Sequence, residues 1–223
     1  MLSFFAHPPH RTNISSQQSF TSSDGAVTTE FITPQYEGDN FKIRQTFHLN
    51  KIQQIRNTGK EPEIIFHKEI FHWNKSENFT LESGKLASHC EGRFHTYYSA
   101  VIDFEAYPGW SHIFEVYSDK ENEDGVFTRK LENGEKFFRN LFGYLDDCQK
   151  ANIKPDIFQI LLILHDNQTS LTVPKIPAKI RKFFGKWVLG YIGGKIIGEK
   201  ILGYRSSYPE YYVERKSSGK KNQ

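Results

Sequence analysis

Cysteine is scarce in this chain. The 223 residues include two cysteines, Cys90 and Cys148, which lie 58 positions apart and form no CxxC pair. Two thiols at this spacing provide neither a disulfide framework nor a zinc site. Their small number is typical of proteins in a reducing compartment. We therefore expect a cytoplasmic protein that does not depend on disulfide bonds.

The chain also lacks a long apolar run at its N-terminus, where a signal peptide would have one, and in its apolar C-terminal region, where a membrane-spanning helix would need one. In the apolar C-terminal region the longest uncharged run, Trp187 to Gly194, has eight residues, whereas a membrane-spanning helix needs about 20. The N-terminus "MLSFFAHPPHRTNISS" has no basic start, and its apolar run is too short for a secretory signal. We expect neither a signal peptide nor a transmembrane segment, so the sequon at Asn78 has no predicted role.

An excess of charge of one sign is absent as well. The formal net charge is +3, and much of the positive charge follows residue 175 or lies in the closing "ERKSSGKKNQ". A short basic end of this kind is typical of a solvated tail. We expect residues 214–223 to be a disordered basic tail, and we expect no nucleic-acid partner.

Aromatic residues and short alternating segments are plentiful. Aromatics make up 15% of the chain, which favours strands and a bulky interior. Residues 1–38, rich in Ser, Thr, Gln and Pro, are predicted to be a loosely ordered leader with one strand near "GAVTTEFIT". Residues 39–131 contain short segments such as "FKIRQTFHL" and "YSAVIDFEA", separated by turn residues. This pattern predicts a sandwich or small barrel.

After residue 131 the spacing of the apolar residues changes from that of a strand to that of a helix. In "NGEKFFRNLFGYLDDCQKAN", Phe137, Phe138, Leu141 and Leu145 recur on one face of a helix. A second helix is predicted to begin at Pro155 and Asp156. The basic, glycine-bearing stretch after Pro177 then either packs on the barrel or lies in a dimer interface. The alternative is an amphipathic helix on an anionic membrane surface.

The histidines of the strand-rich region are candidates for a metal site. Same-face residues of a strand lie two apart, as do His72 and Asn74. Glu77 can return to the same point after a one-residue irregularity. His112 follows the Pro-Gly turn of "AYPGWSH" and can start a strand at the barrel mouth. His67 and His95 are alternative ligands if the loops bring them close.

Two segments resemble the metal-binding motifs of the cupin superfamily. "FHWNKSENFTLESGKL", residues 71–86, is similar to the first motif, and "PGWSH", residues 108–112, is similar to the second. The first motif normally has two histidines. With His72 as the first, Asn74 takes the second position; without a gap, His72 is the second and Ile70 takes the first. One imidazole is absent in either register.

The resemblance extends beyond the motifs. "EKFFRNLFGYLDDCQKANIKPDIFQILLIL" and "LGYRSSYPEYY" resemble the C-terminal helices and closing segment of fungal single-domain cupins, which are described as oxidoreductases of polyketide and other secondary metabolism. The resemblance implies a mainly β cupin jelly-roll barrel over 39–131. A helical segment, 132–213, would pack on the barrel or pair with a second subunit in a homodimer.

The resemblance also implies a metal-dependent oxidoreductase acting on a small aromatic or polyketide-like metabolite. His72, Glu77 and His112 would bind one divalent ion, iron first and manganese or zinc second, in the facial arrangement of non-haem iron oxygenases. Asn74, a neutral oxygen donor, would hydrogen-bond a water or the substrate. The residues predicted to line the pocket are Trp73, Phe79, Phe104, Tyr107 and Trp110. The alternative is a cupin that binds a small molecule without metal or catalysis.

Overall fold

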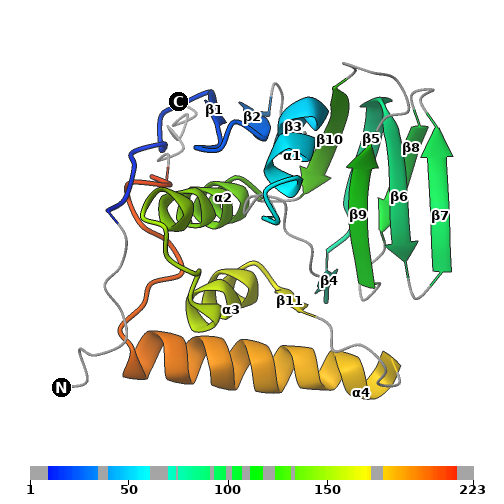
Figure 1. Ribbon diagram of the computed structural model, residues 1–223. Helices are drawn as coiled ribbons and strands as arrows, with labels where there is room; N and C mark the ends of the chain where they lie inside the picture. Colours follow the sequence, from blue (N-terminus) through cyan, green and yellow to red (C-terminus); the bar gives the residue numbers. More distant parts are fainter. Residues whose placement is uncertain are drawn as a thin grey trace, which may run out of the picture.

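The computed structural model contains two antiparallel sheets and a group of C-terminal helices (Figure 1). It describes residues 10–34, 40–60, 70–73, 75–90, 93–98, 102–106, 111–117, 124–131, 134–171 and 178–214. The strands are β1 (Ser19–Thr21), β2 (Val27–Ile32), β3 (Lys42–Phe47), β4 (Ile70–His72), β5 (Glu77–Ser83), β6 (Lys85–Cys90), β7 (Arg93–Tyr98), β8 (Ile102–Ala106), β9 (Ser111–Tyr117), β10 (Gly125–Leu131) and β11 (Thr169–Leu171). The helices are α1 (Leu49–Arg56), α2 (Gly134–Lys150), α3 (Ile157–Asp166), α4 (Ala178–Phe183) and the π-helix η1 (Phe184–Ile201).

The strand pairing is that of a jelly roll. Strands β3 to β10 pair as one long folded hairpin, β3 with β10, β4 with β9, β5 with β8 and β6 with β7. Rolling this hairpin adds the pairs β5–β10 and β6–β9. The result is sheet A, in the order β1-β2-β3-β10-β5-β8, and sheet B, in the order β11-β4-β9-β6-β7. The predicted jelly roll is confirmed, while closure into a barrel stays a prediction.

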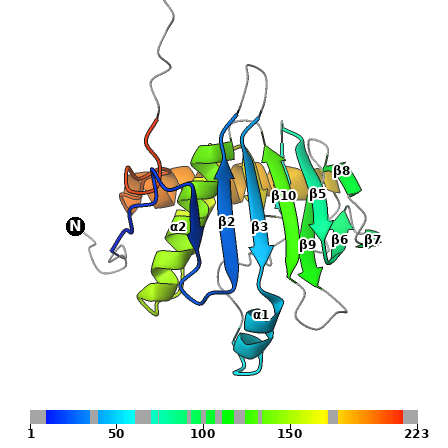
Figure 2. The ribbon, with the colours of Figure 1, turned by 90° about the horizontal axis from the view of Figure 1, so that it is seen from above.

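Residues 10–34 differ from the expected loosely ordered leader. They contain β1 and β2, which extend sheet A beyond the jelly roll (Figure 2). Ile14, Phe20, Val27 and Phe31 are buried in the main core. The strand predicted near "GAVTTEFIT" is β2, in which Val27, Thr29 and Phe31 share the buried face.

Helix α2 covers the extension of sheet A. The four residues predicted to share its apolar face, Phe137, Phe138, Leu141 and Leu145, are all buried. They pack with Phe31 and Ile43 of sheet A in one core cluster. Helix α3 begins as predicted, because the Asp156 side chain caps it by accepting a hydrogen bond from the Phe158 amide at 2.8 Å.

The basic stretch after Pro177 is helical and packs against α3. Glycines recur every four or five residues at 185, 190, 194 and 198 and so share one face of η1, whose hydrogen bonds span five residues. A Cβ at Gly194 or Gly198 would lie 2.9 Å from the carbonyl oxygen of Leu161 or Phe158. The bare glycine face therefore allows the two helix backbones to touch. In the described part of the chain, no helix combines the length and apolar character needed to cross a membrane.

Candidate functional site

The predicted metal ligands lie on three strands of the jelly roll. His72 ends β4, Glu77 begins β5 and His112 is the second residue of β9. Strands β4 and β9 are neighbours in sheet B, whereas β5 belongs to sheet A. Facing sheets pack about 10 Å apart, so ligands from both could meet between them.

The backbone register places the two histidine positions on one face of sheet B. Ile70 is paired with His112, and His72 is two residues from Ile70 on the same strand. Since strand residues alternate between faces, positions 70, 72 and 112 share a face. Cys90 of β6 is paired with His112 from the other side and shares that face too. The side chains of these four residues lie outside what the structure describes.

Glu77 has a partner that the sequence did not predict. Its side chain is 0% exposed, and Oε1 accepts a hydrogen bond from Nε of Arg129 at 2.8 Å. Arg129 lies on β10, where its cross-strand partner is Phe79 and that of Glu77 is Leu131. The ion pair is therefore a diagonal contact on the inner face of sheet A.

The surroundings of Arg129 are aromatic. Its guanidinium carbon lies 5.2 Å from the ring centre of Phe138 on α2 and 5.7 Å from that of Phe79 on β5. The Arg129 side chain is 15% exposed. A cation over aromatic faces in such a site is stabilised by the ring quadrupoles. Arg129 thus joins the α2 core to the carboxylate of the jelly-roll interior.

Phe79 is part of this interior. It is 1% exposed, stacks on Phe127 with ring centres 5.5 Å apart, and is paired in register with Phe104 of β8. The side chain of Phe104 lies outside the described part of the structure. The same is true of His95, whose backbone pairs with Ser88. Four predicted or alternative site residues lie outside the described residues altogether, namely His67, Asn74, Tyr107 and Trp110.

Trp73 packs against the C-terminal helices. Its ring meets the His165 imidazole of α3 edge to face, with centres 5.2 Å apart. Nζ of Lys186 lies 5.4 Å from its ring centre. Its backbone amide donates a hydrogen bond to the Gln168 carbonyl at 3.0 Å. These contacts place Trp73 against α3, the turn that follows α3, and η1.

His165 is the second residue that sequence reasoning missed. Burial, followed by the positive charge of Lys195, lowers its pKa below the usual 6.5. Its Nδ1 is buried and has no hydrogen-bond partner among the described residues. Its contact with Trp73 depends on β4 and α3 meeting, which no local pattern reveals.

The donor types fit a divalent metal, with one competing interaction. Two imidazole positions and one carboxylate make a usable ligand set. Arg129 places a fixed positive charge against Glu77, which disfavours a second cation nearby but can also orient a ligand carboxylate. Among the side chains that the structure describes, no three His, Cys, Asp or Glu residues form a cluster that could hold a metal; His72 and His112 are outside that set.

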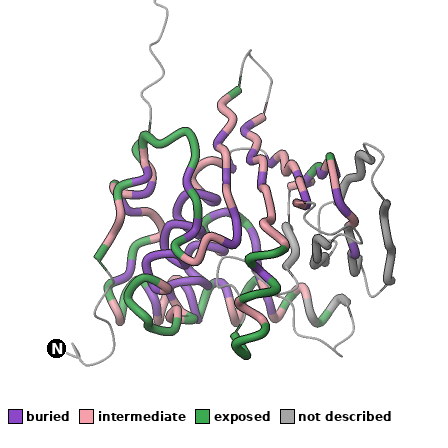
Figure 3. Tube along the Cα trace, turned by 45° about the horizontal axis from the view of Figure 1, so that its top comes forward, coloured by how far each residue is buried: buried purple, intermediate pink, exposed green. Residues whose placement is uncertain are grey.

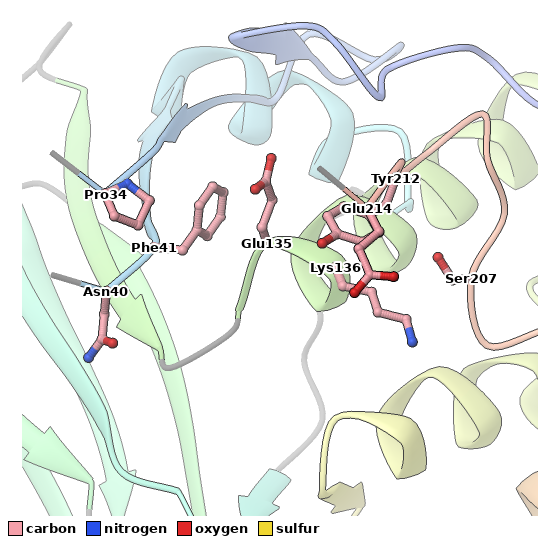
Figure 4. A pocket seen from close by; sticks show the side chains of 8 residues that line it. All are labelled: Pro34, Asn40, Phe41, Glu135, Lys136, Ser207, Tyr212 and Glu214. Carbon is pink, nitrogen blue, oxygen red and sulfur yellow. The ribbon is translucent and has the colours of Figure 1, made fainter. Parts of the chain in front are cut away.

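A separate hollow of about 550 Å³ lies between the ends of β2 and β3, the start of α2 and the C-terminal segment (Figure 4). It is lined by Pro34, Asn40, Phe41, Glu135, Lys136, Ser207, Tyr212 and Glu214. Glu135 is paired with Arg139 at 2.9 Å, and Lys136 is paired with Asp166 at 2.5 Å. Because these charges serve structural pairs, the hollow is a weaker candidate than the interior around Glu77.

The curated proteins that resemble this chain are named as oxidoreductases. Over 219 residues the chain is 32% identical to the probable oxidoreductase virH of Hypocrea virens, covering 92% of this chain and 91% of virH. It is 26% identical over 211 residues to an oxidoreductase of Arthrobotrys oligospora, covering 89% of this chain and 78% of that protein. The oxidoreductase iacF of Pestalotiopsis fici is 27% identical over 175 residues, covering 75% of this chain and 81% of iacF.

No protein-family model matches the chain. Solved structures with similar folds include a double-stranded β-helix protein of Klebsiella pneumoniae, with a TM-score of 0.33 and 15% identity over 54% of this chain and 76% of that one. A cupin domain from an Enterobacter cloacae regulator has a TM-score of 0.31 and 12% identity over 48% of this chain and 96% of that one. The jelly-roll assignment rests on the strand pairing. Because 32% of the aligned residues are identical and the match covers nine tenths of both chains, this chain belongs to the same family as virH, a probable oxidoreductase of Hypocrea virens.

Proposed function

We propose that this protein is a cupin-type oxidoreductase that acts on a small aromatic or polyketide-like metabolite inside the jelly roll. The observation that carries the proposal is the full-length similarity to virH, a probable oxidoreductase. An interior that combines stacked Phe79 and Phe127 with the buried Glu77–Arg129 pair supports it. Side chains of this kind would offer an apolar surface to a planar ring and a few fixed polar groups.

The reaction would depend on one divalent metal ion, with iron preferred over manganese or zinc. His72, Glu77 and His112 would hold it, and a bound iron would supply the one-electron chemistry that the side chains lack. Asn74 would hydrogen-bond a water or the substrate. Arg129 would balance the charge of the buried Glu77 carboxylate in the metal-free protein. Phe79 would support an aromatic ring by stacking.

A homodimer is part of this proposal. Strands β7 and β8 end sheets B and A, and an edge strand offers unpaired backbone groups to a second copy. The molar mass of the purified protein, measured by light scattering, tests this point.

The experiment for the activity uses protein reconstituted with iron without oxygen and then exposed to air with a panel of phenols and hydroxylated aromatic ketones. Conversion of at least one compound is expected by mass spectrometry, and His112→Ala should abolish it. If the iron-loaded protein binds panel compounds but converts none, the oxidoreductase proposal is wrong.

A metal-free binding protein is the second candidate. The observation that favours it is the Glu77–Arg129 pair, because Arg129 already balances the buried carboxylate. This candidate predicts that panel compounds raise the melting temperature equally with and without EDTA. If the protein is instead a metal-dependent enzyme, EDTA should remove most of the rise in melting temperature that the compounds cause.

A further inference from the structure

The outward face of the C-terminal helices is apolar and aromatic. Phe183 and Trp187 are 62% and 48% exposed, and their neighbours Ile180, Tyr191, Ile192 and Ile201 are exposed as well. The rings of Trp187 and Tyr191 contact each other, with centres 5.9 Å apart. We call these six residues the aromatic face. Exposed apolar side chains that gather in this way mark an interaction surface.

The packing of η1 explains why these residues point outward. The glycines at 190, 194 and 198 are held against α3 and its surroundings, and the Gly185 carbonyl accepts a hydrogen bond from the Ser170 hydroxyl. Phe183, Trp187 and Tyr191 recur every four residues and fall on the opposite side. Figure 1 shows α4 and η1 along one outer edge of the molecule with α3 on one side, and Figure 3 marks the exposed residues of the chain in green.

Positive charge is concentrated on the same helices. Residues 178–201 contain six Lys or Arg and one acidic residue, Glu199, for a net charge of +5. The whole chain carries +3, so the remainder carries −2. Lys182, Lys186 and Lys195 are at least partly exposed. Nζ of Lys186 lies 5.7 Å from the Trp187 ring centre, so charge and aromatic surface are adjacent.

We infer that this face rests on an anionic lipid surface. Exposed Trp, Tyr and Phe suit the headgroup level of a bilayer, and flanking lysines attract anionic lipids. A second copy of the chain is a poorer occupant, because the two helical segments 178–201 would each bring a net charge of +5 and would repel each other. A membrane-bound cupin would receive apolar metabolites directly from the bilayer, so the inference extends beyond the proposed chemistry.

Flotation with vesicles tests this inference. Vesicles of phosphatidylcholine alone are compared with vesicles containing about a third phosphatidylserine, whose negative surface attracts basic residues. Binding is expected only with phosphatidylserine. It should weaken at least tenfold between about 0.1 M and about 1 M salt, where the screening length falls from about 10 Å to about 3 Å.

Two variants separate charge from aromatic insertion. Lys182→Glu/Lys186→Glu and Trp187→Ser/Tyr191→Ser should each reduce binding at least tenfold. Lys51→Glu/Lys60→Glu, which changes exposed lysines around α1 on the opposite side of the molecule, should leave binding unchanged. Circular dichroism verifies that each variant is folded.

Three outcomes would overturn the inference. Equal binding to both kinds of vesicle would exclude recognition of anionic lipid. Undiminished binding by both helix variants would place the contact elsewhere. Absence of vesicle binding, together with a dimer that dissociates in Trp187→Ser/Tyr191→Ser, would assign the aromatic face to a second copy.

Discussion

Arg129 and Glu77 form a buried ion pair between neighbouring strands of sheet A, with Nε and Oε1 2.8 Å apart. The pair lies where the α2 core meets the jelly-roll interior, because Arg129 also contacts Phe138 and Phe79. One of the three proposed metal ligands is therefore held by a protein cation.

Removing the Arg129 charge should destabilise the fold. In Arg129→Met, Glu77 would remain buried without its cation, so the free energy of unfolding should fall by about 3–5 kcal/mol. Urea denaturation measures it. The control is Arg44→Met, since Arg44 pairs with Glu82 at 2.8 Å with both side chains about a third exposed; its expected cost is about 0–1 kcal/mol. Equal losses of unfolding free energy in the two variants would show that the Arg129–Glu77 pair stabilises the fold no more than a surface ion pair does.

Arg129 should also oppose metal binding. After EDTA treatment, Mn²⁺ is expected to raise the melting temperature of Arg129→Gln more than that of the wild type, because the metal then replaces the positive charge that Glu77 lost. Thermal denaturation with and without Mn²⁺ measures the difference. A smaller rise in the variant would show that Arg129 orients Glu77 for the metal instead.

Because η1 packs closely on α3, adding a side chain at the contact should destabilise the fold. Alanine is a better helix former than glycine by about 1 kcal/mol, yet Gly194→Ala should lower the free energy of unfolding by about 1–3 kcal/mol. The new Cβ would lie 2.9 Å from the Leu161 carbonyl oxygen. Because this oxygen belongs to the backbone of α3, it cannot move away as easily as the end of a side chain. The matched variant is Gly190→Ala, which meets the His165 side chain at 2.7 Å and should cost less. A stabilised Gly194→Ala would contradict the close contact.

His165 should make the fold sensitive to mild acid. Its pKa is lowered in the folded state, first by burial and then by Lys195, so the unfolded chain binds the proton more readily. Stability should therefore decrease as the pH falls through the unfolded value of 6.5. Urea denaturation from neutral to mildly acidic pH should show a shallower decline for His165→Gln than for the wild type. The same dependence of stability on pH in both proteins would show that His165 is not the cause of the acid sensitivity.

The strands and the C-terminal helices could be predicted from local signals, and the jelly roll from the resemblance to cupins. The short alternating segments of residues 39–131 predicted strands, and the structure buries Glu77, Phe79 and Leu81 on one side of β5. The Asp156 cap predicted where α3 begins. The order of the residues in "GVFTRKL" also placed Arg129 on the same face as Phe127, which could have pointed to an inward arginine.

Long-range contacts account for what the sequence missed. The pairing of β2 with β3 turned residues 10–34 into part of the core, although their composition is polar. The Glu77–Arg129 pair joins positions 52 apart, and the Trp73–His165 contact joins positions 92 apart. No periodicity within a short window reveals either contact.

The most direct test of the central claim is the metal content of the purified, untagged protein after anaerobic reconstitution, measured per chain beside His72→Ala and His112→Ala. The account predicts close to one iron or manganese per chain in the wild type and its loss in both variants. Metal far below one per chain in the wild type, or full retention in both variants, would contradict a site built on His72, Glu77 and His112.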